Sequence, residues 1–263
     1  MPELPLVERF RSEAERYARG RRVERARSVV DDMMMPGLSP RRFAAALAGR
    51  RVMAVERRGK FLWLRFDQPP HLVMHFGMTG ELLYGKYNRP KHWRFELTLT
   101  GGRVLTLVDP RRFGRVVLVR DPLLEPPVSE LGFDPWLDPI GPAAFTREVQ
   151  ARSALIKAIL LDQSFAAGVG NWIADEVLHL ARIDPRRPGR ELSPVECRRV
   201  HRQLLAVVRL ATEAGSREEH FPRHWLFHLR WGRNTGLQTV RGQPIKFEVV
   251  AGRSTAWVPL VQV

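Results

Sequence analysis

The sequence predicts an α+β protein with an N-terminal helix, an antiparallel β-sheet structure in its first half, and a mainly helical second half that ends in a β-hairpin. Three observations lead to this prediction. Apolar residues recur at helical spacing from Leu4 to Tyr17, alternate with period two in several segments between Val52 and Val119, and return to helical spacing after residue 150. Six prolines between Asp121 and Pro142 interrupt both periodicities, so we expect a linker there.

The first element is an amphipathic helix. Its apolar residues are spaced so that one face is buried, which would hold the N-terminus in place. These residues are Leu4, Val7, Phe10, Ala14 and Tyr17.

The strands follow. Alternation is clearest in Arg94–Thr100, where Phe95, Leu97 and Leu99 share one face, as in a half-buried strand. Closely spaced strands of this kind indicate an antiparallel sandwich or barrel. The other predicted strands are Phe61–Phe66, Leu72–Phe76, Arg103–Val108 and Arg115–Val119.

The second half contains three predicted helices, Ser153–Leu161, Asn171–Ala181 and Pro194–Ala214. The turn Ala166–Gly170, with two glycines, separates the first two. From Trp231 to Val263 the chain is rich in Gly, Thr and Val, which indicates a hairpin.

The charge of the chain favours a polyanionic partner. The 263 residues include 43 Lys and Arg against 28 Asp and Glu, a net charge of +15. The excess is shared by residues 1–150 and 151–263, so both halves can face the same polyanion. The alternative is a solvated, arginine-rich surface, because 38 of the 43 basic residues are arginines.

Cysteine and histidine usage excludes several kinds of site. Cys197 is the single cysteine, so the chain can form neither an intrachain disulfide nor a zinc site of four cysteines or of two cysteines and two histidines. The eight histidines show no close ligand pairing, and we expect no metal site. No apolar run approaches the roughly 18 residues that span a membrane, so we expect a soluble, intracellular protein with no membrane partner.

Four separated segments together resemble the formamidopyrimidine-DNA glycosylase / endonuclease VIII family. They are Met1–Pro5, His75–Gly80, Asp109–Gly114, and the stretch Leu160–Gln163 that continues through Ala167–Asn171 to Asp175–Glu176. The resemblance implies a bifunctional base-excision glycosylase and AP lyase that acts as a monomer on damaged double-stranded DNA. It also implies an N-terminal β-sandwich, a helix-two-turns-helix domain and a DNA cleft between them, and a reaction that requires no metal and no cofactor.

On this basis we expect a β-sandwich domain over residues 1–122, a proline-rich linker over 123–150, a helix-two-turns-helix domain over 151–227 and a finger hairpin over 228–263. The expected location is the cytoplasm, with the nucleoid, in a bacterium, or the nucleus in a eukaryote.

The expected catalytic residues are Pro2, Glu3 and Lys60. Once Met1 is removed, Pro2 carries a secondary α-amine, and α-amines titrate near ~8 rather than near the ~10.4 of lysine, so a neutral, nucleophilic fraction exists at physiological pH. Glu3 would act as the proton donor and relay. Taken alone, a Met-Pro start is common and an early glutamate can simply favour a helix N-terminus.

Four residues are expected to contact DNA phosphates or lie near them: Lys60, His75, Asn171 and Arg253. Asn171 follows a glycine-rich turn at the start of a helix, where free amides favour an anion. The alternatives are a solvated strand-end lysine for Lys60, a buried core histidine for His75 and plain helix capping for Asn171.

The resemblance further implies that Met78, Arg111 and Phe113 fill the gap left by an extruded base. A thioether, a guanidinium and an aromatic ring suit insertion between bases. Taken singly, Met78 and Phe113 would more often be core residues. Their glycine-flanked turns predict exposure instead.

Two departures from the family pattern bear on specificity and stability. The finger has no zinc-binding cysteines, which resembles the zincless-finger branch, and Leu6 replaces the usual glutamate. The candidate lesion-covering loop Gly215–His224 is highly charged and lacks the threonine-rich character of purine-specific members. We expect oxidised purines to be slightly favoured over pyrimidines.

Three alternatives stay open. They are an endonuclease VIII-like activity specific for oxidised pyrimidines, a non-catalytic damaged-DNA-binding protein, and a helix-two-turns-helix module that binds RNA or the ribosome.

Overall fold

The fold is described from a computed structural model, for residues 2–85, 90–231 and 242–263. The chain divides into two compact units, one formed by Pro2 and residues 6–130, the other by residues 3–5 and 131–263. Each unit has its own hydrophobic core.

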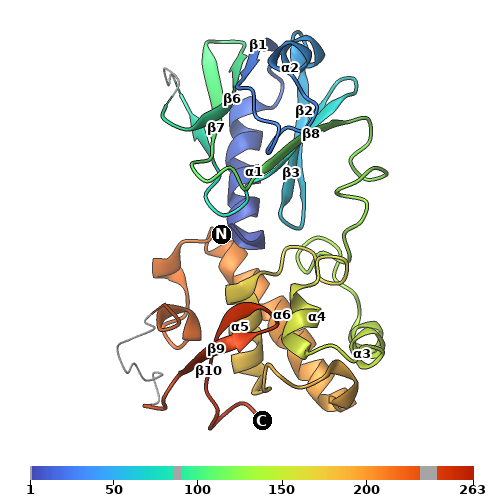
Figure 1. Ribbon diagram of the computed structural model, residues 1–263, viewed down its shortest axis with the longest axis vertical. Coiled ribbons are helices and arrows are strands. Elements are labelled where there is room, and N and C mark those ends of the chain that lie inside the picture. The colour runs from blue at the N-terminus through green and yellow to red at the C-terminus, as the bar shows by residue number, and fades with distance from the viewer. Residues whose placement is uncertain (1, 86–89, 232–241) are drawn as a thin grey trace. The chain divides into compact units, whose positions relative to one another are not determined.

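The first unit is a sandwich of two four-stranded antiparallel sheets (Figure 1). One sheet has the order β1-β6-β7-β5 and the other β2-β3-β4-β8. The predicted fold class is confirmed. The strands are β1 (Val23–Ser28), β2 (Val52–Arg58), β3 (Phe61–Phe66), β4 (His71–His75), β5 (Glu81–Tyr84), β6 (Trp93–Leu99), β7 (Arg103–Val108) and β8 (Arg115–Val119).

Helix α1 (Leu4–Ala18) contributes Val7, Phe10 and Ala14 to the same buried cluster as both sheets. The Phe10 ring lies 4.8 Å from that of Phe76, which follows β4. The amphipathic spacing read from the sequence therefore corresponds to the face that packs in this core.

Four elements of the first unit were not predicted individually: β2 and β5, which lie inside the alternating region but were not among the predicted strands, and β1 and α2. Strand β1 has the sequence VERARS, whose three charged residues hide the alternation. Helix α2 (Pro40–Leu47) has only eight residues, too few for a clear period. It does carry a readable start, since Ser39 caps it by accepting a hydrogen bond from the Arg42 amide and Pro40 follows at the first helical position.

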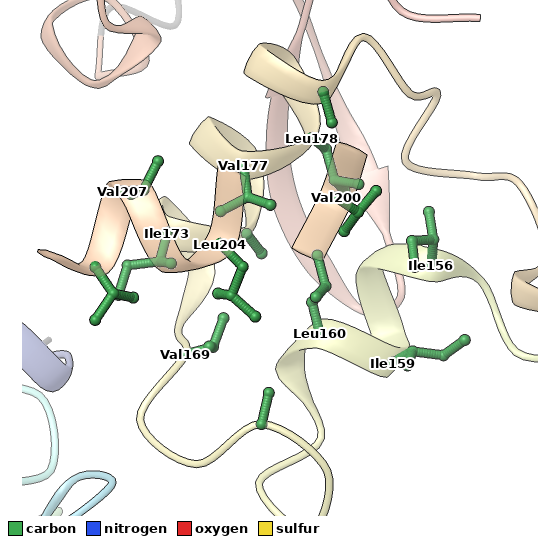
Figure 2. Packing of buried hydrophobic residues seen from close by; sticks show 14 of the residues in the cluster. Ile156, Ile159, Leu160, Val169, Ile173, Val177, Leu178, Val200, Leu204 and Val207 are labelled. Carbon is green, nitrogen blue, oxygen red and sulfur yellow. The ribbon is translucent and has the colours of Figure 1, made fainter. Parts of the chain in front are cut away.

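The second unit is built from four helices and a hairpin. The helices are α3 (Pro142–Gln150), α4 (Ile156–Leu161), α5 (Asn171–Ala181) and α6 (Pro194–Glu213), and the hairpin consists of β9 (Lys246–Val250) and β10 (Arg253–Trp257). Short 3-10 turns occupy Gly189–Glu191, Glu218–His220 and Leu226–His228. Figure 2 shows the side chains of α4, α5 and α6 that pack together in this core, among them Leu160, Ile173 and Leu204.

Helix α3 lies inside the range that we expected to be a linker. Its residues Phe145 and Val149 are buried in the helical core. The prolines that flank this stretch masked a nine-residue helix, since Pro142 occupies its first position, where a proline is tolerated. Part of the predicted hairpin, residues 232–241, lies outside the described residues.

Candidate active site and wedge loops

Glu3 is held against the start of α5. Its side chain is 3% exposed. Its carboxylate accepts hydrogen bonds from the backbone amides of Trp172, at 3.0 Å, and Ile173, at 3.2 Å. These amides have no partner within the helix, and the helix dipole favours a negative charge there. The residue that follows Pro2 is thereby fixed in position.

Two glycines of the predicted turn allow this approach. A Cβ at Gly170 would lie 2.2 Å from Cδ of Glu3, and one at Gly168 would lie 2.8 Å from Cβ of Leu4. Gly168 also has φ +91°, and its carbonyl accepts a hydrogen bond from the Leu4 amide at 3.1 Å. The glycine-bearing turn of the sequence is therefore the surface on which the N-terminal residues lie.

The expectation that the α5 N-terminus offers free amides to a phosphate is wrong in one respect. The anion that meets the amides of Trp172 and Ile173 is Glu3. Asn171 does not cap the helix either, because Gly170 occupies that position. Instead the Asn171 side-chain amide donates to the carbonyl of Ser254, at 2.7 Å, and thus contacts the hairpin.

A buried lysine fixes the hairpin to α4 and α5. Lys157 is 0% exposed, and its Nζ donates to Oδ1 of Asp175 at 2.6 Å, to Oγ1 of Thr255 at 2.6 Å and to the carbonyl of Ser254 at 3.2 Å. An ammonium has three donors, and all three are used. Burial lowers the pKa of Lys157, and the charge of Asp175 opposes that shift.

Asp175 completes this cluster. Its second oxygen accepts from Nη2 of Arg230 at 2.6 Å and from the Ala256 amide at 3.2 Å. The next residue, Glu176, accepts from the amides of Leu226 and Phe227. Burial raises the pKa of Glu176 to about 8, against the opposing effect of those two amides. Asp175 is therefore bonded to the hairpin and to Arg230, and Glu176 to the 3-10 turn at Leu226–His228.

Arg253 stands at the turn of this hairpin. Ala251 and Gly252 have φ values of 52° and 70°, and Val250 pairs with Arg253 across them, as in a two-residue type I′ turn. Arg253 is exposed, while Thr255, two residues later, is buried against Lys157. The hairpin thus exposes an arginine at its turn and is anchored two residues later.

Lys60 and His75 lie close together in the first unit. Lys60 follows Gly59 in the two-residue turn between β2 and β3 and is 8% exposed, so it is not a solvated strand-end lysine. The His75 ring packs on Phe61 at 4.9 Å, and Nδ1 accepts from the Gly77 amide at 3.1 Å. Burial and the charge of Lys60 lower the pKa of His75 to about 4. His75 is therefore neutral at physiological pH, with its proton on Nε2.

Two loops of the first unit expose the predicted wedge residues. We call residues 77–80 the first wedge loop and residues 110–114 the second. Met78 in the first is 43% exposed and Phe113 in the second 51%. The Arg111 guanidinium lies 4.7 Å from the centre of the Phe113 ring. These three side chains are therefore exposed and do not belong to the core.

Lys157 and Asp175 were not among the residues predicted to have a role. Lys157 is the one charged residue in the apolar run from Leu155 to Leu161, and a charge on an otherwise buried helical face requires a partner. That signal could have identified Lys157, but only the fold brings Thr255 and Arg230 to it.

Within the described residues, no helix combines the length and apolar character needed to cross a membrane. In the same part of the chain, His, Cys, Asp and Glu side chains do not gather in groups of three or more that could hold a metal ion.

A sandwich unit with exposed wedge loops, followed by a helical unit that holds the N-terminal glutamate and carries a hairpin, defines the class of helix-two-turns-helix DNA glycosylases. Sequence comparison is consistent at the level of both units. The formamidopyrimidine-DNA glycosylase N-terminal domain matches residues 1–116, and the formamidopyrimidine-DNA glycosylase H2TH domain matches residues 131–221.

Comparison with individual proteins gives the same family over the whole chain. A formamidopyrimidine-DNA glycosylase of Thermus thermophilus is 37% identical over 276 residues, covering 100% of this chain and 98% of the relative. A structure of MutM in complex with DNA containing carbocyclic 8-oxo-G matches with a TM-score of 0.87 and 26% identity over 100% of both chains. Wild-type Fpg of Lactococcus lactis in complex with DNA containing an oxidised pyrimidine matches with a TM-score of 0.86 and 26% identity over 99% of both chains. The chain belongs to the formamidopyrimidine-DNA glycosylase family.

Proposed function

We propose that this protein excises oxidised bases from double-stranded DNA and then cleaves the strand, with Pro2 as the nucleophile. The Pro2 nitrogen attacks C1′, the bond from C1′ to the base breaks, and the base leaves with that electron pair and a proton. The sugar ring then opens: the C1′–O4′ bond breaks, its electron pair stays on O4′, which takes a proton, and the nitrogen lone pair forms the C1′=N bond of an iminium ion. The iminium ion withdraws electrons from C2′, which loses a proton, and β- and then δ-elimination release the phosphates. The amine exists only after Met1 has been removed.

The position of Glu3 is the observation that carries this proposal. Two helix amides orient its carboxylate, and a buried, oriented carboxylate beside an amine is suited to proton transfer. Glu3 can accept the proton of the Pro2 ammonium and donate it to the sugar ring oxygen. A glutamate that only stabilised the helix dipole would not need such close packing. Here Gly168 and Gly170 leave room for Leu4 and Glu3 where a side chain would clash.

The DNA contacts that we propose use both units. Lys60, His75, Asn171 and Arg253 bind phosphates around the extruded nucleotide, with His75 donating from Nε2. Met78, Arg111 and Phe113 occupy the gap in the base stack. The net charge of +15 and the relatives solved with lesion-containing DNA support this assignment.

The preferred lesion is an oxidised purine. The similarity to MutM bound to 8-oxo-G DNA supports this preference, and the three wedge residues are those expected of purine-acting members. Activity on oxidised pyrimidines is the second candidate, favoured by the similarity to a relative solved with such a lesion and by Leu6 and the charged loop Gly215–His224. Single-turnover excision of 8-oxoguanine and of thymine glycol from matched duplexes separates the two.

Borohydride trapping tests the chemistry. The wild-type protein, with Met1 removal verified by mass spectrometry, should form a covalent adduct with an oligonucleotide that contains one abasic site. Peptide mapping should place the adduct on the nitrogen of Pro2. An adduct on Lys60 or Lys157 would overturn the assigned nucleophile, and a processed protein that binds the DNA without trapping would show a binding-only role.

We also propose that the protein acts as a monomer and without a metal ion. Size-exclusion chromatography with light scattering should give one chain per particle. Metal analysis should find less than one zinc per chain, and treatment with a chelator should leave excision unchanged.

A further inference from the structure

The two wedge loops are joined through a single buried carboxylate, that of Asp109 at the end of β7. Asp109 is 0% exposed. Its Oδ1 accepts from Oγ1 of Thr79 in the first wedge loop, at 2.6 Å, and from the Arg111 amide in the second, at 3.2 Å. Its Oδ2 accepts from the Gly114 amide at 2.8 Å. One side chain therefore bonds to both ends of the second loop and to the first loop.

The loops also touch directly. A Cβ at Gly77 would lie 2.3 Å from the carbonyl carbon of Phe113, and one at Gly114 would lie 2.7 Å from the carbonyl oxygen of His75. Backbone packs on backbone here, so a shift of one loop displaces the other.

Asp109 is itself firmly held. Its carbonyl accepts from Nε and Nη2 of Arg94, at 2.9 and 2.8 Å, and its amide donates to the carbonyl of His92. The carboxylate accepts three hydrogen bonds, and the backbone of Asp109 is bonded to Arg94 on β6 and to His92 just before β6. These backbone bonds hold Asp109 in place without any contribution from the exposed residues of the two loops.

A second carboxylate separates the roles of the two adjacent arginines. Arg112 has φ 59° and directs its guanidinium to Asp31, with donor distances of 3.0 and 2.8 Å. Asp31 is 4% exposed and also accepts from the Met34 amide. With Arg112 fixed in this way, Arg111 is the arginine that lies over Phe113.

We propose that Asp109 is a positioning residue that couples Met78, Arg111 and Phe113 into one rigid wedge through its bonds to Thr79, Arg111 and Gly114. This inference rests on the proposed function. Insertion between bases has to offset the free-energy cost of unstacking them. A wedge whose parts move independently loses conformational entropy on insertion and is therefore less effective. The coupling matters only where a base must be extruded from a duplex.

The test substitutes Thr79, which carries the bond between the loops and is exposed enough to be changed without loss of the fold. Thr79→Val removes the donor at nearly constant volume, and Thr79→Ser restores it. Thr106→Val is the matched control, because Thr106 is buried on β7 and its hydroxyl has no hydrogen-bond partner in the described part of the chain. Asp109→Asn provides a second variant at the carboxylate itself.

Two substrates are compared for each protein: a duplex with one 8-oxoguanine, and a single-stranded oligonucleotide with one abasic site. We expect Thr79→Val to lower single-turnover excision from the duplex about tenfold, as for the loss of a hydrogen bond to a charged group. Borohydride trapping on the single strand should stay within about twofold of wild type. Thr79→Ser should recover most of the duplex rate, and Thr106→Val should match wild type.

The outcomes separate this inference from the proposed function. If the wild type neither excises nor traps, the proposed function fails. If the wild type excises and both Thr79→Val and Asp109→Asn leave the duplex rate unchanged, the coupling is refuted. An equal loss on both substrates would also refute it, since that pattern indicates general damage to the site.

Discussion

Gly170 is a glycine because a residue distant in the sequence, Glu3, packs against it. The glycine suggested a turn, and a turn is present, but the space that it leaves is occupied by the carboxylate of Glu3. A helix that begins with unpaired amides needs an acceptor, and here a residue 169 positions earlier supplies it. Residues 3 and 4 thus contact the turn before α5 because two glycines leave room for them.

His75 gives a prediction about pH. Its pKa in the folded protein, about 4, lies below the ordinary value of 6.5. Between these values the unfolded chain binds a proton that the folded protein does not, so the free energy of unfolding falls as the pH decreases from about 6.5 towards 4. The slope attributable to His75 is at most about 1.4 kcal/mol per pH unit.

Urea unfolding at several pH values, compared with His75→Asn, measures this slope. Asparagine retains an acceptor for the Gly77 amide but does not titrate. The difference between the two proteins should be constant above pH 7 and should change in favour of the variant below pH 6. Parallel pH profiles would contradict the assigned burial of a neutral imidazole.

Residue types suggested chemical roles but did not indicate the surroundings of each residue in the fold. The segment around Lys60 indicated a phosphate contact, and the lysine does lie in a turn, but its burial beside a neutral histidine could not be read locally. Met78 and Phe113 were recognisable by their glycine-flanked loops. Asp109 was visible within the same motif, yet its partner Thr79 is 30 residues away and adjacent only in the folded sandwich.

At the scale of elements, charged and polar side chains attach the hairpin β9–β10 to the helices. Lys157 on α4 and Asp175 on α5 each bond to β10, and Arg230 joins them from the segment after α6. Such a cluster is stable because every donor of the ammonium and both carboxylate oxygens have partners. It gives a hairpin without zinc-binding cysteines a fixed connection to the helices.

Lys157→Met tests that connection. The substitution keeps the volume but leaves Asp175 with one cation fewer, and breaking a buried pair in this way costs about 3 kcal/mol of stability. We also expect faster proteolysis of the hairpin and weaker binding of abasic-site DNA, because the Arg253 turn loses its support. Equilibrium unfolding and limited proteolysis measure both effects.

Lys91→Met is the control, since Lys91 is exposed and its loss should change stability by less than about 0.5 kcal/mol. If Lys157→Met were as stable as this control, the cluster would not be what holds the hairpin.

Elements with a clear apolar pattern were predicted well. Helix α5 and strands β3, β7 and β8 begin and end where the sequence indicated. Short helices and a charged strand were missed. Helices α2 and α3 have eight and nine residues, too few turns for a clear helical period, and charged residues on β1 obscure its alternation. Their formation depends on packing against partners that sequence spacing does not reveal.

At the scale of the whole molecule, the positive charge is spread along the chain and not confined to a tail. A distributed charge of this kind favours a long contact with a polyanion, and each neutralised phosphate of double-stranded DNA releases counterions. The affinity for a duplex with an abasic site should therefore fall steeply as the salt concentration rises. The slope of log K against log salt reports how many phosphates the protein neutralises.

Arg253→Ala provides the corresponding prediction. If Arg253 binds a phosphate, the slope of log K against log salt should become shallower by about 1 and the affinity should fall on every duplex sequence alike. Fluorescence anisotropy between 50 and 300 mM salt, about the range in which such slopes are measured, would determine it. Arg19→Ala is the matched control, because Arg19 is exposed and paired with Glu15 on α1. If Arg253→Ala had the same salt slope as the wild type and as Arg19→Ala, Arg253 would not bind a phosphate. The hairpin turn would then not belong to the DNA interface.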